Sequence, residues 1–267
     1  MKQLDQIVKW TAAFLATGLI STQAQTISQW DFNSNPADAS TSTGISTPSI
    51  GAGTISFLGG VTSTFAGGSP GDPAAGGNDN SGLNLTTWAA QGAGSGTRGL
   101  QVAVSTVGFA NISISLDFRQ SGTVSRFFQL QASTDGLNFN DVSGGSASLG
   151  VLNNNTGTSF TSAGLYSNNP GGGSQTYAQA INYVFAAGSA YENNPNFAFR
   201  WVAVFDPANG ANYISANAGT TTAYAATGTG RFDMVTVASV VPEPTAFALG
   251  ALGLLGIMFR KRAGAHQ

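Results

Sequence analysis

The chain has 267 residues, no cysteine, one histidine (His266) and a formal net charge of −2. All its lysines lie near the two ends, so residues 25–242 carry five arginines against ten carboxylates, a net charge of −5. Such a surface repels phosphate backbones, which argues against nucleic acid as a partner. Without cysteine or histidine, this region also lacks the commonest zinc, copper and iron ligands and any Ser-His or Cys-His nucleophile pair.

Residues 1–24 are typical of a signal peptide. Lys2 and Lys9 precede an apolar stretch at 10–20, and Thr22 and Ala24 place small residues at the two cleavage positions. An uncleaved N-terminal anchor is the alternative, but the stretch is shorter than the about 17 residues that a membrane span needs. We therefore expect an exported ectodomain at residues 25–240, long enough to form one large core.

Alternation of apolar and polar residues predicts β-strands in this ectodomain. Residues 111–118 alternate strictly, so one face is apolar and the other is polar. Residues 197–205 alternate too but are largely apolar on both faces, which is typical of a central strand. Asp135 and Gly136 predict a tight turn after a strand at 126–133, because Asp-Gly accepts positive φ. Further strands are expected at residues 27–32, 53–58, 100–107, 137–142, 177–185 and 231–240.

The order of these elements predicts the fold class. Long loops rich in Gly, Asn, Ser and Pro separate the strands at 66–82, 144–174 and 209–230, and the ectodomain has no convincing amphipathic helix and no internal repeat. This pattern predicts an all-β protein, an antiparallel β-sandwich of the jelly-roll, lectin-like type. The first strand is expected beside the last, with Trp30 and Phe232 in the core.

Two loops gather side-chain oxygens and are candidates for a structural calcium site. Calcium takes about six to eight oxygen ligands from carboxylates, amides and backbone carbonyls. The spacing is not that of an EF-hand, and the alternative is that these residues only form turns. The candidates are Asp72 and Asp79, with Asn78 and Asn80, in one loop, and Asp135 and Asp141, with Asn138 and Asn140, in the other.

The carboxylates give little support for catalysis. A glycoside hydrolase needs two carboxyl groups that face each other across a cleft. Upstream of the tail the ectodomain has one glutamate, Glu192, and no spacing selects a partner for it. The aspartates at 117, 206 and 233 are expected at strand ends or edges, close to arginines. We therefore expect a protein that is not an enzyme.

Aromatic side chains offer a binding function instead, because sugar sites on β-sandwiches stack pyranose rings on exposed aromatic faces. The competing interpretation is that these residues fill the core and anchor loops. Trp30 and Trp201 are expected in the core. The candidates in or beside loops are Trp88, Tyr166, Tyr177, Tyr191, Tyr213 and Tyr224.

The last part of the chain has three segments in a fixed order. A proline-rich segment cannot continue a strand, because each proline lacks an amide donor. The uncharged apolar run at 246–259 is short for a membrane span, but flanking basic side chains and local thinning of the bilayer let it reach across. The segments are Val241, Pro242, Glu243, Pro244 and Thr245, then the apolar run, then the basic cluster Arg260, Lys261 and Arg262.

This arrangement resembles the PEP-CTERM sorting signal of Gram-negative bacteria, over residues 241–267 only. The resemblance implies that an exosortase, a membrane-embedded protease and transpeptidase, recognises the motif and severs the apolar helix from the exported domain. An ordinary C-terminal anchor in the inner membrane is the alternative. The segments 115–119, 128–136, 196–200 and 232–237 resemble the lectin-like ectodomain found on many PEP-CTERM proteins, which implies a fold but no function.

Together these features predict an exported structural protein associated with extracellular polysaccharide. It is expected to pass through the inner membrane, held there by its C-terminal helix until processing, and then to reach the cell envelope or the medium. The alternative is a carbohydrate-binding module, and a glycoside hydrolase is the least favoured reading. The sequence selects no ligand-binding residues.

Overall fold

The structure, a computed structural model, describes residues 23–75, 77, 79–153, 155, 157–168, 176–217 and 222–241. The fold described below is that of the compact unit Gln25–Ser239. Residues 1–22, with most of the expected signal peptide, and residues 242–267, with most of the expected sorting signal, lie outside the described residues. Within the described ranges no helix is long and apolar enough to cross a membrane.

The first sheet, sheet A, has eight strands whose order is β10-β13-β7-β15-β1-β2, with β5 pairing β15 and β4 pairing β5. Every register recorded between these strands is antiparallel. The strands of sheet A are β1 (Gln23–Trp30), β2 (Ile50–Gly51), β4 (Thr62–Gly67), β5 (Ser81–Thr86), β7 (Ile112–Gln120), β10 (Ser146–Ser148), β13 (Ala178–Val184) and β15 (Gly230–Val241).

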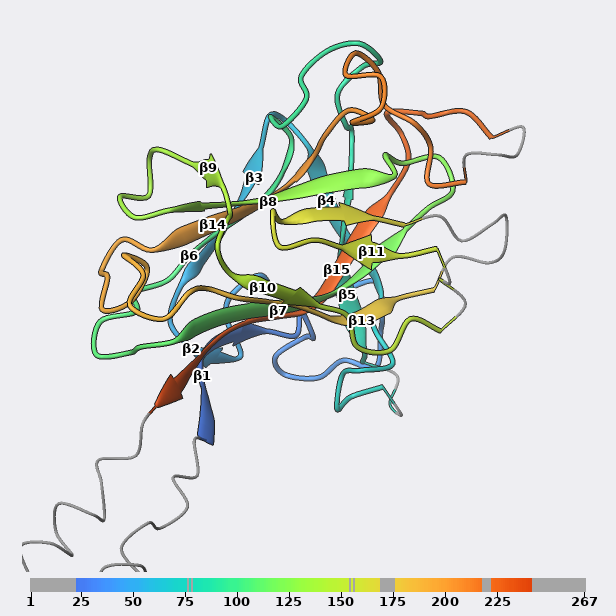
Figure 1. The fold of residues 1–267 in the computed structure, drawn as a ribbon. Coiled ribbons are helices and arrows are strands. Elements are labelled where there is room, and N and C mark those ends of the chain that lie inside the picture. The colour runs from blue at the N-terminus through green and yellow to red at the C-terminus, as the bar shows by residue number, and fades with distance from the viewer. Residues whose placement is uncertain are drawn as a thin grey trace, which may run out of the picture. The chain divides into compact units, whose positions relative to one another are not determined.

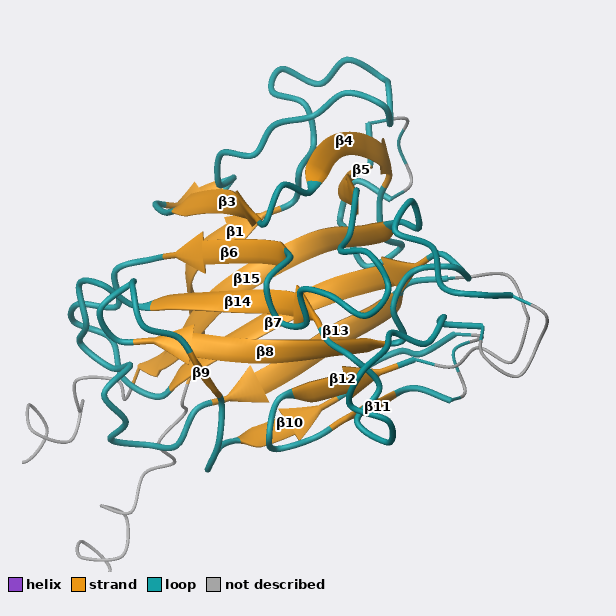
Figure 2. Cartoon of the chain, turned by 90° about the horizontal axis from the view of Figure 1, so that it is seen from above, coloured by secondary structure: helices purple, strands orange, loops and turns teal. Residues whose placement is uncertain are grey.

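The second sheet, sheet B, has seven strands in the order β11-β12-β8-β14-β6-β3, with β9 pairing β8, and it is antiparallel as well. Its strands are β3 (Thr54–Leu58), β6 (Gly99–Ala103), β8 (Phe127–Ser133), β9 (Asn140–Asp141), β11 (Ser159–Phe160), β12 (Leu165–Ser167) and β14 (Ala198–Ala203). Figures 1 and 2 show the two sheets as two layers.

An aromatic core joins the layers. The ring centroid of Phe118, on β7 of sheet A, lies 4.8 Å from that of Phe128 on β8 and 5.8 Å from that of Trp201 on β14. Such edge-to-face contacts add to the burial of apolar area. The prediction of an all-β, antiparallel, sandwich-like fold is therefore confirmed.

The expected neighbours are also found. Strand β14, predicted to be central, lies between β8 and β6, and β1 lies beside β15. Trp30 and Phe232 are fully buried in the core. All buried core residues of the described chain lie between Ile27 and Val237, so the ectodomain has a hydrophobic core of its own.

The structure corrects several strand boundaries. The strand expected at 137–142 is reduced to Asn140–Asp141, because the backbone N–H groups of Leu137 and Asn138 donate to the Asp135 carboxylate instead of to a ladder. The loop expected at 66–82 is shorter, since β4 extends into it from one side and β5 from the other. The expected loop at 144–174 contains three short strands, β10 to β12. Their few residues give too little alternation to predict.

Candidate functional site

The two predicted acidic loops lie on different sheets. Asp72 belongs to the loop between β4 and β5 in sheet A, whereas Asp135 and Asp141 lie in and after the turn that follows β8 in sheet B. The four aspartates predicted for calcium therefore do not form one site. Among the residues that the structure describes, no three Asp, Glu, His or Cys side chains are arranged to hold a metal ion.

The Asp135 carboxylate is satisfied by its own turn. Its Oδ1 accepts hydrogen bonds from the backbone N–H groups of Leu137 (2.8 Å) and Asn138 (2.7 Å) and from the Ser133 hydroxyl (2.8 Å), and its Oδ2 accepts from Asn138 Nδ2 (2.6 Å). These donors, led by the backbone of Asn138, hold the pKa of Asp135 well below its usual range. Gly136 follows in the left-handed conformation, φ 72°, as the predicted turn requires.

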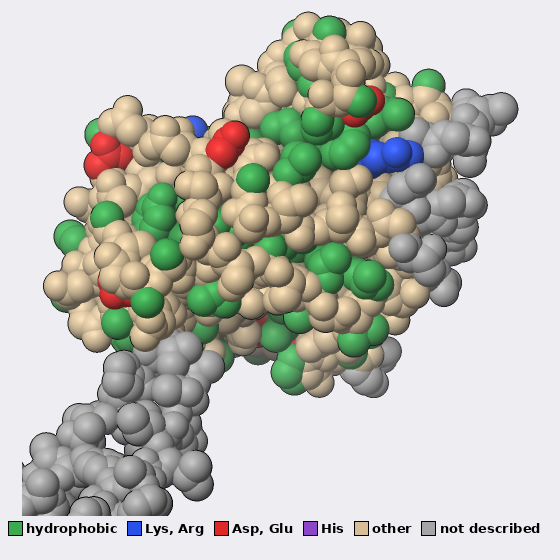
Figure 3. Space-filling view, viewed as in Figure 1, with side chains coloured by type: hydrophobic (Ala, Val, Ile, Leu, Met, Phe, Trp, Pro, Cys, Tyr) green, Lys and Arg blue, Asp and Glu red, His purple; other side chains and the backbone are tan. Residues whose placement is uncertain are grey.

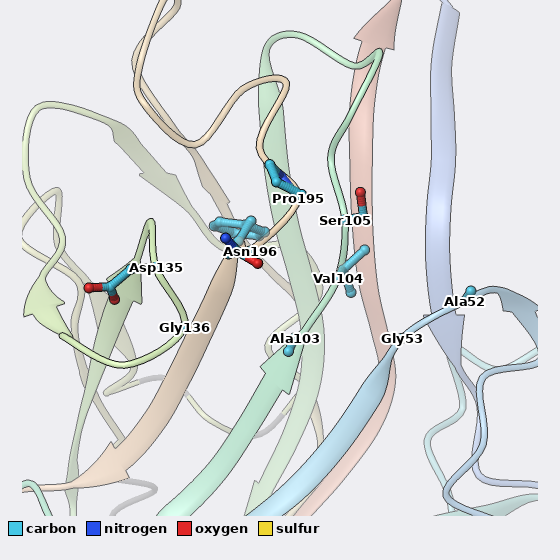
Figure 4. A pocket seen from close by; sticks show the side chains of 10 residues that line it. Ala52, Gly53, Ala103, Val104, Ser105, Asp135, Gly136, Pro195 and Asn196 are labelled. Atoms are coloured by element: carbon cyan, nitrogen blue, oxygen red, sulfur yellow. The ribbon is translucent and has the colours of Figure 1, made fainter.

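A cavity of about 330 Å³ lies next to this turn, between the ends of β3 and β6 and the segment that leads into β14. Figure 4 shows that the Asp135 carboxylate points away from Ala103 and Gly53 on the opposite wall. Asp141, the second candidate of this loop, is exposed and accepts a hydrogen bond from Gln131 Nε2 (3.0 Å). At this site the acidic residues therefore stabilise the turn itself, which was the alternative to a calcium site.

A different group of carboxylates is buried on sheet A. Asp117 of β7 and Asp233 of β15 are direct cross-strand partners, next to the pair Phe118 and Phe232. Side chains alternate between the faces of a strand, so the two phenylalanines enter the core and the two aspartates point to the opposite face. The expectation that these aspartates end or edge their strands is wrong, because both lie inside β7 and β15.

The β4–β5 loop (residues 68–80) covers these two carboxylates. Its residue Ser69 donates its backbone N–H to Asp233 Oδ2 (2.6 Å) and its hydroxyl to Asp117 Oδ2. Asp72 lies in the same loop, where Asn33 Nδ2 donates to its Oδ2 (2.9 Å). We call Ser69, Asp72, Asn80, Asp117 and Asp233 the buried acidic cluster, since each of them is less than one tenth exposed.

Two β-bulges supply the remaining donors. Ala180 on β13 and Met234 on β15 both have positive φ, 50° and 48°, at breaks in the strand register. The Ala180 N–H donates to Asp117 Oδ1 (2.7 Å), and the Met234 N–H donates to Asp233 Oδ1 (2.8 Å). A left-handed conformation is unfavourable for residues with a side chain. Each bulge thus directs a backbone amide at a carboxylate of the cluster.

The electrostatics of this cluster are unfavourable for two ionised carboxylates. Burial, helped by the charges of Asp72 and Asp117, raises the pKa of Asp233 to about 8, although hydrogen bonds from Ser69 and Met234 act to lower it. Burial likewise raises the pKa of Asp117. Like charges directly opposite each other on neighbouring strands destabilise a sheet. The cluster therefore favours a bound positive charge, either a proton or a cation.

One oxygen in the cluster has no donor. Asn80 is 7% exposed, and its Nδ2 donates to the Ser69 carbonyl (2.8 Å), but its Oδ1 is buried without a hydrogen-bond partner among the described residues. A Cβ built on Gly68 would overlap both Asn80 Oδ1 and Asp233 Oδ2. The two oxygens therefore lie close together against Gly68, at a place that a larger residue would fill with its side chain.

The other predicted candidates of this loop lie outside the cluster. Asp79 is half-buried, and its Oδ1 is a buried atom without a hydrogen-bond partner in the described part of the chain. Asn78 lies outside the described residues. Sequence reasoning missed Asp117 and Asp233 as site residues. The available signal was their place on the polar faces of two long strands, between Arg119 and Arg231 on one side and Ser115 and Thr236 on the other.

The aromatic candidates for sugar stacking are mostly buried, as the competing interpretation of these side chains expects. Trp88, Tyr166, Tyr177 and Tyr213 are buried. Tyr191 and Tyr224 are half-buried and pack against the core. The structure thus agrees with the competing interpretation of these side chains.

Glu192, the sequence candidate for catalysis, is bound by its own loop region. Its Oε1 accepts hydrogen bonds from the backbone N–H groups of Asn111 and Gly188, each at 2.9 Å. This oxygen joins the loop before β14 to the start of β7.

A polar row crosses the outer face of sheet B. Gln131 on β8 is in register with Asp141 on β9 and Arg200 on β14, and Arg200 is in register with Gln101 on β6. Arg200 Nε donates to Gln101 Oε1 (2.7 Å), and its guanidinium carbon lies 3.5 Å from the ring centroid of Phe139. We call these four polar residues the sheet-B polar row. Gln131 and Asp141 also line a hollow of about 660 Å³.

Comparison with protein-family models identifies a sorting signal that follows the sandwich in the sequence. The PEP-CTERM protein-sorting motif matches residues 240–262, which contain all the residues predicted for the motif, the apolar run and the basic cluster. The chain is thus an exported protein sorted to the cell envelope. More particularly, it is a PEP-CTERM domain-containing protein and an exosortase substrate, as the sequence predicted. No curated protein matches the chain.

Proposed function

We propose that the protein is a structural component of the cell envelope or extracellular matrix, where its ectodomain associates with polysaccharide. The observation that carries the proposal is the sorting motif at residues 240–262, which directly follows the last core residue, Val237. Cleavage within the motif region removes no described core residue. The exosortase therefore has a substrate whose exported part stays folded after processing.

The sorting steps follow from the three tail segments. The apolar run 246–259 passes through the inner membrane, and the basic cluster 260–262 stays on the cytoplasmic side by the positive-inside tendency. The exosortase then reads the motif 241–245 at the outer side and severs the run. The N-terminal signal peptide 1–24 starts the export.

The surface of the ectodomain supports a matrix role. The face seen in Figure 3 consists mostly of uncharged polar side chains and backbone, with few charged groups. Of the exposed large hydrophobic residues in the described part, one is aromatic, Phe57. Many hydroxyl and amide groups form hydrogen bonds with sugars and water alike, so this surface suits a hydrated polysaccharide environment. The proposal includes a lectin-like jelly-roll topology and no enzymatic activity.

Intact-mass measurement of the protein from medium, envelope and membrane fractions of the native host tests this proposal. We expect the exported species to end near Pro244, without the apolar run. The variant Glu243→Ala is expected to accumulate as unprocessed protein in the membrane fraction, whereas His266→Ala, outside the motif, is processed normally. Full-length wild-type protein confined to the inner membrane would contradict sorting and indicate an ordinary anchor.

The sheet-B polar row favours carbohydrate binding as a second candidate function. Amide, guanidinium and carboxylate groups side by side are the groups that fix sugar hydroxyls, and the hollow of about 660 Å³ next to Gln131 and Asp141 has the size of a small ligand site. Affinity electrophoresis in host polysaccharide tests it. Arg200→Ala and Gln131→Ala are expected to remove the retardation, and Asn182→Ala on sheet A is the control. Equal retardation of all four proteins contradicts a defined site.

A further inference from the structure

The buried acidic cluster places two carboxylates opposite each other on neighbouring strands, with Arg119 and Arg231 two positions along the same strands. The described hydrogen bonds to Asp117 and Asp233 come from neutral donors, namely the Ser69 hydroxyl and the backbone amides of Ser69, Ala180 and Met234. Both aspartates are buried, Asp117 at 5% and Asp233 at 0% exposure. A buried ionised carboxylate normally requires a paired charge or a metal. A positive group in direct contact with these carboxylates would stabilise their ionised forms.

A second observation points to a metal ion. Asn80 Oδ1 is buried and has no donor in the described part of the chain, although buried amide oxygens are normally satisfied. It converges with Asp233 Oδ2 at Gly68, where a side-chain carbon would overlap both atoms. A proton carried by Asp233 Oδ2 and donated to Asn80 Oδ1 would satisfy both oxygens, but it would leave the neighbouring charges of Asp72 and Asp117 without a cation. A cation can be coordinated by both oxygens at once and also offsets these charges.

The chemistry of these atoms selects the kind of cation. The ligands are carboxylate and amide oxygens, with neither sulfur nor imidazole, which suits hard cations. Calcium accepts a variable number of oxygens in flexible geometry, whereas Mg²⁺ demands a near-ideal octahedron. Extracellular modules also bind calcium with dissociation constants of about 10⁻⁴ to 10⁻³ M.

We propose that the buried acidic cluster binds one Ca²⁺, with Asp233 Oδ2 and Asn80 Oδ1 as ligands beside Gly68 and with Asp117 as a neighbouring negative charge. Backbone carbonyls and water complete the ligand shell. The site differs from the loops predicted from the sequence, since of the four aspartates predicted there it includes only Asp72, as a nearby charge. It does not depend on the sorting function.

The ion gives the β4–β5 loop a defined role. Asn80 lies at the end of this loop, and Asp233 lies on β15 next to its bulge. A shared ion joins the loop to β15 and offsets the charge of Asp117 on the neighbouring strand β7. The exported domain has no disulfide to do this, because the chain has no cysteine.

Thermal unfolding of the full-length protein, purified in mild detergent and stripped with chelator, tests the proposal. Calcium at about 100 times its dissociation constant is expected to raise the melting temperature by roughly 5–10 °C. The same concentration of Mg²⁺ is expected to give a much smaller shift. Calorimetric titration should give one Ca²⁺ per chain. An unchanged melting curve in excess Ca²⁺ overturns the proposal.

The variant Asp117→Asn locates the ion. Asparagine keeps both contacts, because its Oδ1 still accepts from the Ala180 N–H and its Nδ2 donates to the Ser69 hydroxyl oxygen. The variant is therefore expected to fold, to melt at a higher temperature than the wild type in chelator, and to bind calcium about tenfold or more weakly. Asp135→Asn is the matched control, and its calcium response should equal that of the wild type. A response lost in Asp135→Asn but kept in Asp117→Asn overturns the assignment.

Discussion

The Asp135 turn and the buried acidic cluster use the same residue type in opposite ways. At the turn, Asp135 is exposed and accepts four hydrogen bonds from residues within three positions of it, so its ionised form is stabilised locally. In the cluster, Asp117 and Asp233 are buried side by side, and burial disfavours their ionised forms. The difference shows that an acidic loop in a sequence is weak evidence for a metal, whereas buried carboxylates with incomplete protein contacts are stronger evidence.

The largest loss of stability is expected for Asp233→Ala, in the buried acidic cluster. The backbone N–H groups of Ser69 and Met234 both lose their acceptor, and each buried unsatisfied amide costs about 1–3 kcal/mol. In calcium the variant is expected to lose about 2–5 kcal/mol of unfolding free energy, measured by chemical denaturation. A loss no larger than that of Asp135→Ala would show that the buried and the exposed aspartate contribute equally to the unfolding free energy.

A glycine substitution tests the space between the cluster oxygens. A Cβ on Gly68 overlaps Asn80 Oδ1 and Asp233 Oδ2, so Gly68→Ala is expected to lower the unfolding free energy by about 1–3 kcal/mol and to weaken the calcium response. Gly67→Ala is the matched control, because a Cβ there meets no atom within 4 Å. Equal melting temperatures for the two variants would contradict the convergence of oxygens at Gly68.

The sequence predicted the parts of the fold that depend on local alternation. The two apolar faces of residues 197–205 predicted a central strand, and β14 is central in sheet B. The pairing of first and last strands and the burial of Trp30 and Phe232 followed from the sandwich class alone. Short strands such as β11 were not predicted, since two residues carry no period.

The candidate site was only partly predictable, because its residues meet through tertiary structure. Asp72 and Asn80 lie in a loop rich in oxygens and were found by composition. Asp117 and Asp233 lie on the polar faces of strands, where the sequence suggests contact with water. Only the fold of the β4–β5 loop over that face buries them, and no local pattern predicts this placement. The sorting motif was predictable in full because its residues are contiguous.

A smaller effect is expected at the Asp135 turn, and its pH dependence has a definite sign. Because the pKa of Asp135 is lower in the folded state than its ordinary value, its ionised form stabilises the fold at neutral pH. This stabilisation is complete above the ordinary pKa of about 3.9 and is lost as the pH falls through the folded-state pKa. Asp135→Ala should therefore melt below the wild type at pH 7, and the difference should shrink below about pH 4. A difference that grows towards acid would contradict this account.

The smallest effect on stability is expected for Asp141→Ala. This variant tests the sheet-B polar row without changing the Asp135 turn. Asp141 is exposed and has one side-chain hydrogen bond, from Gln131 Nε2, so the unfolding free energy should change by less than about 0.5 kcal/mol. The calcium response should also stay the same, since this residue lies on the other sheet from the cluster. Its position at the hollow of about 660 Å³ predicts instead a loss of retardation in host polysaccharide if sheet B binds sugars. Unchanged retardation, with Arg200→Ala unchanged as well, would leave the matrix role as the better account of this face.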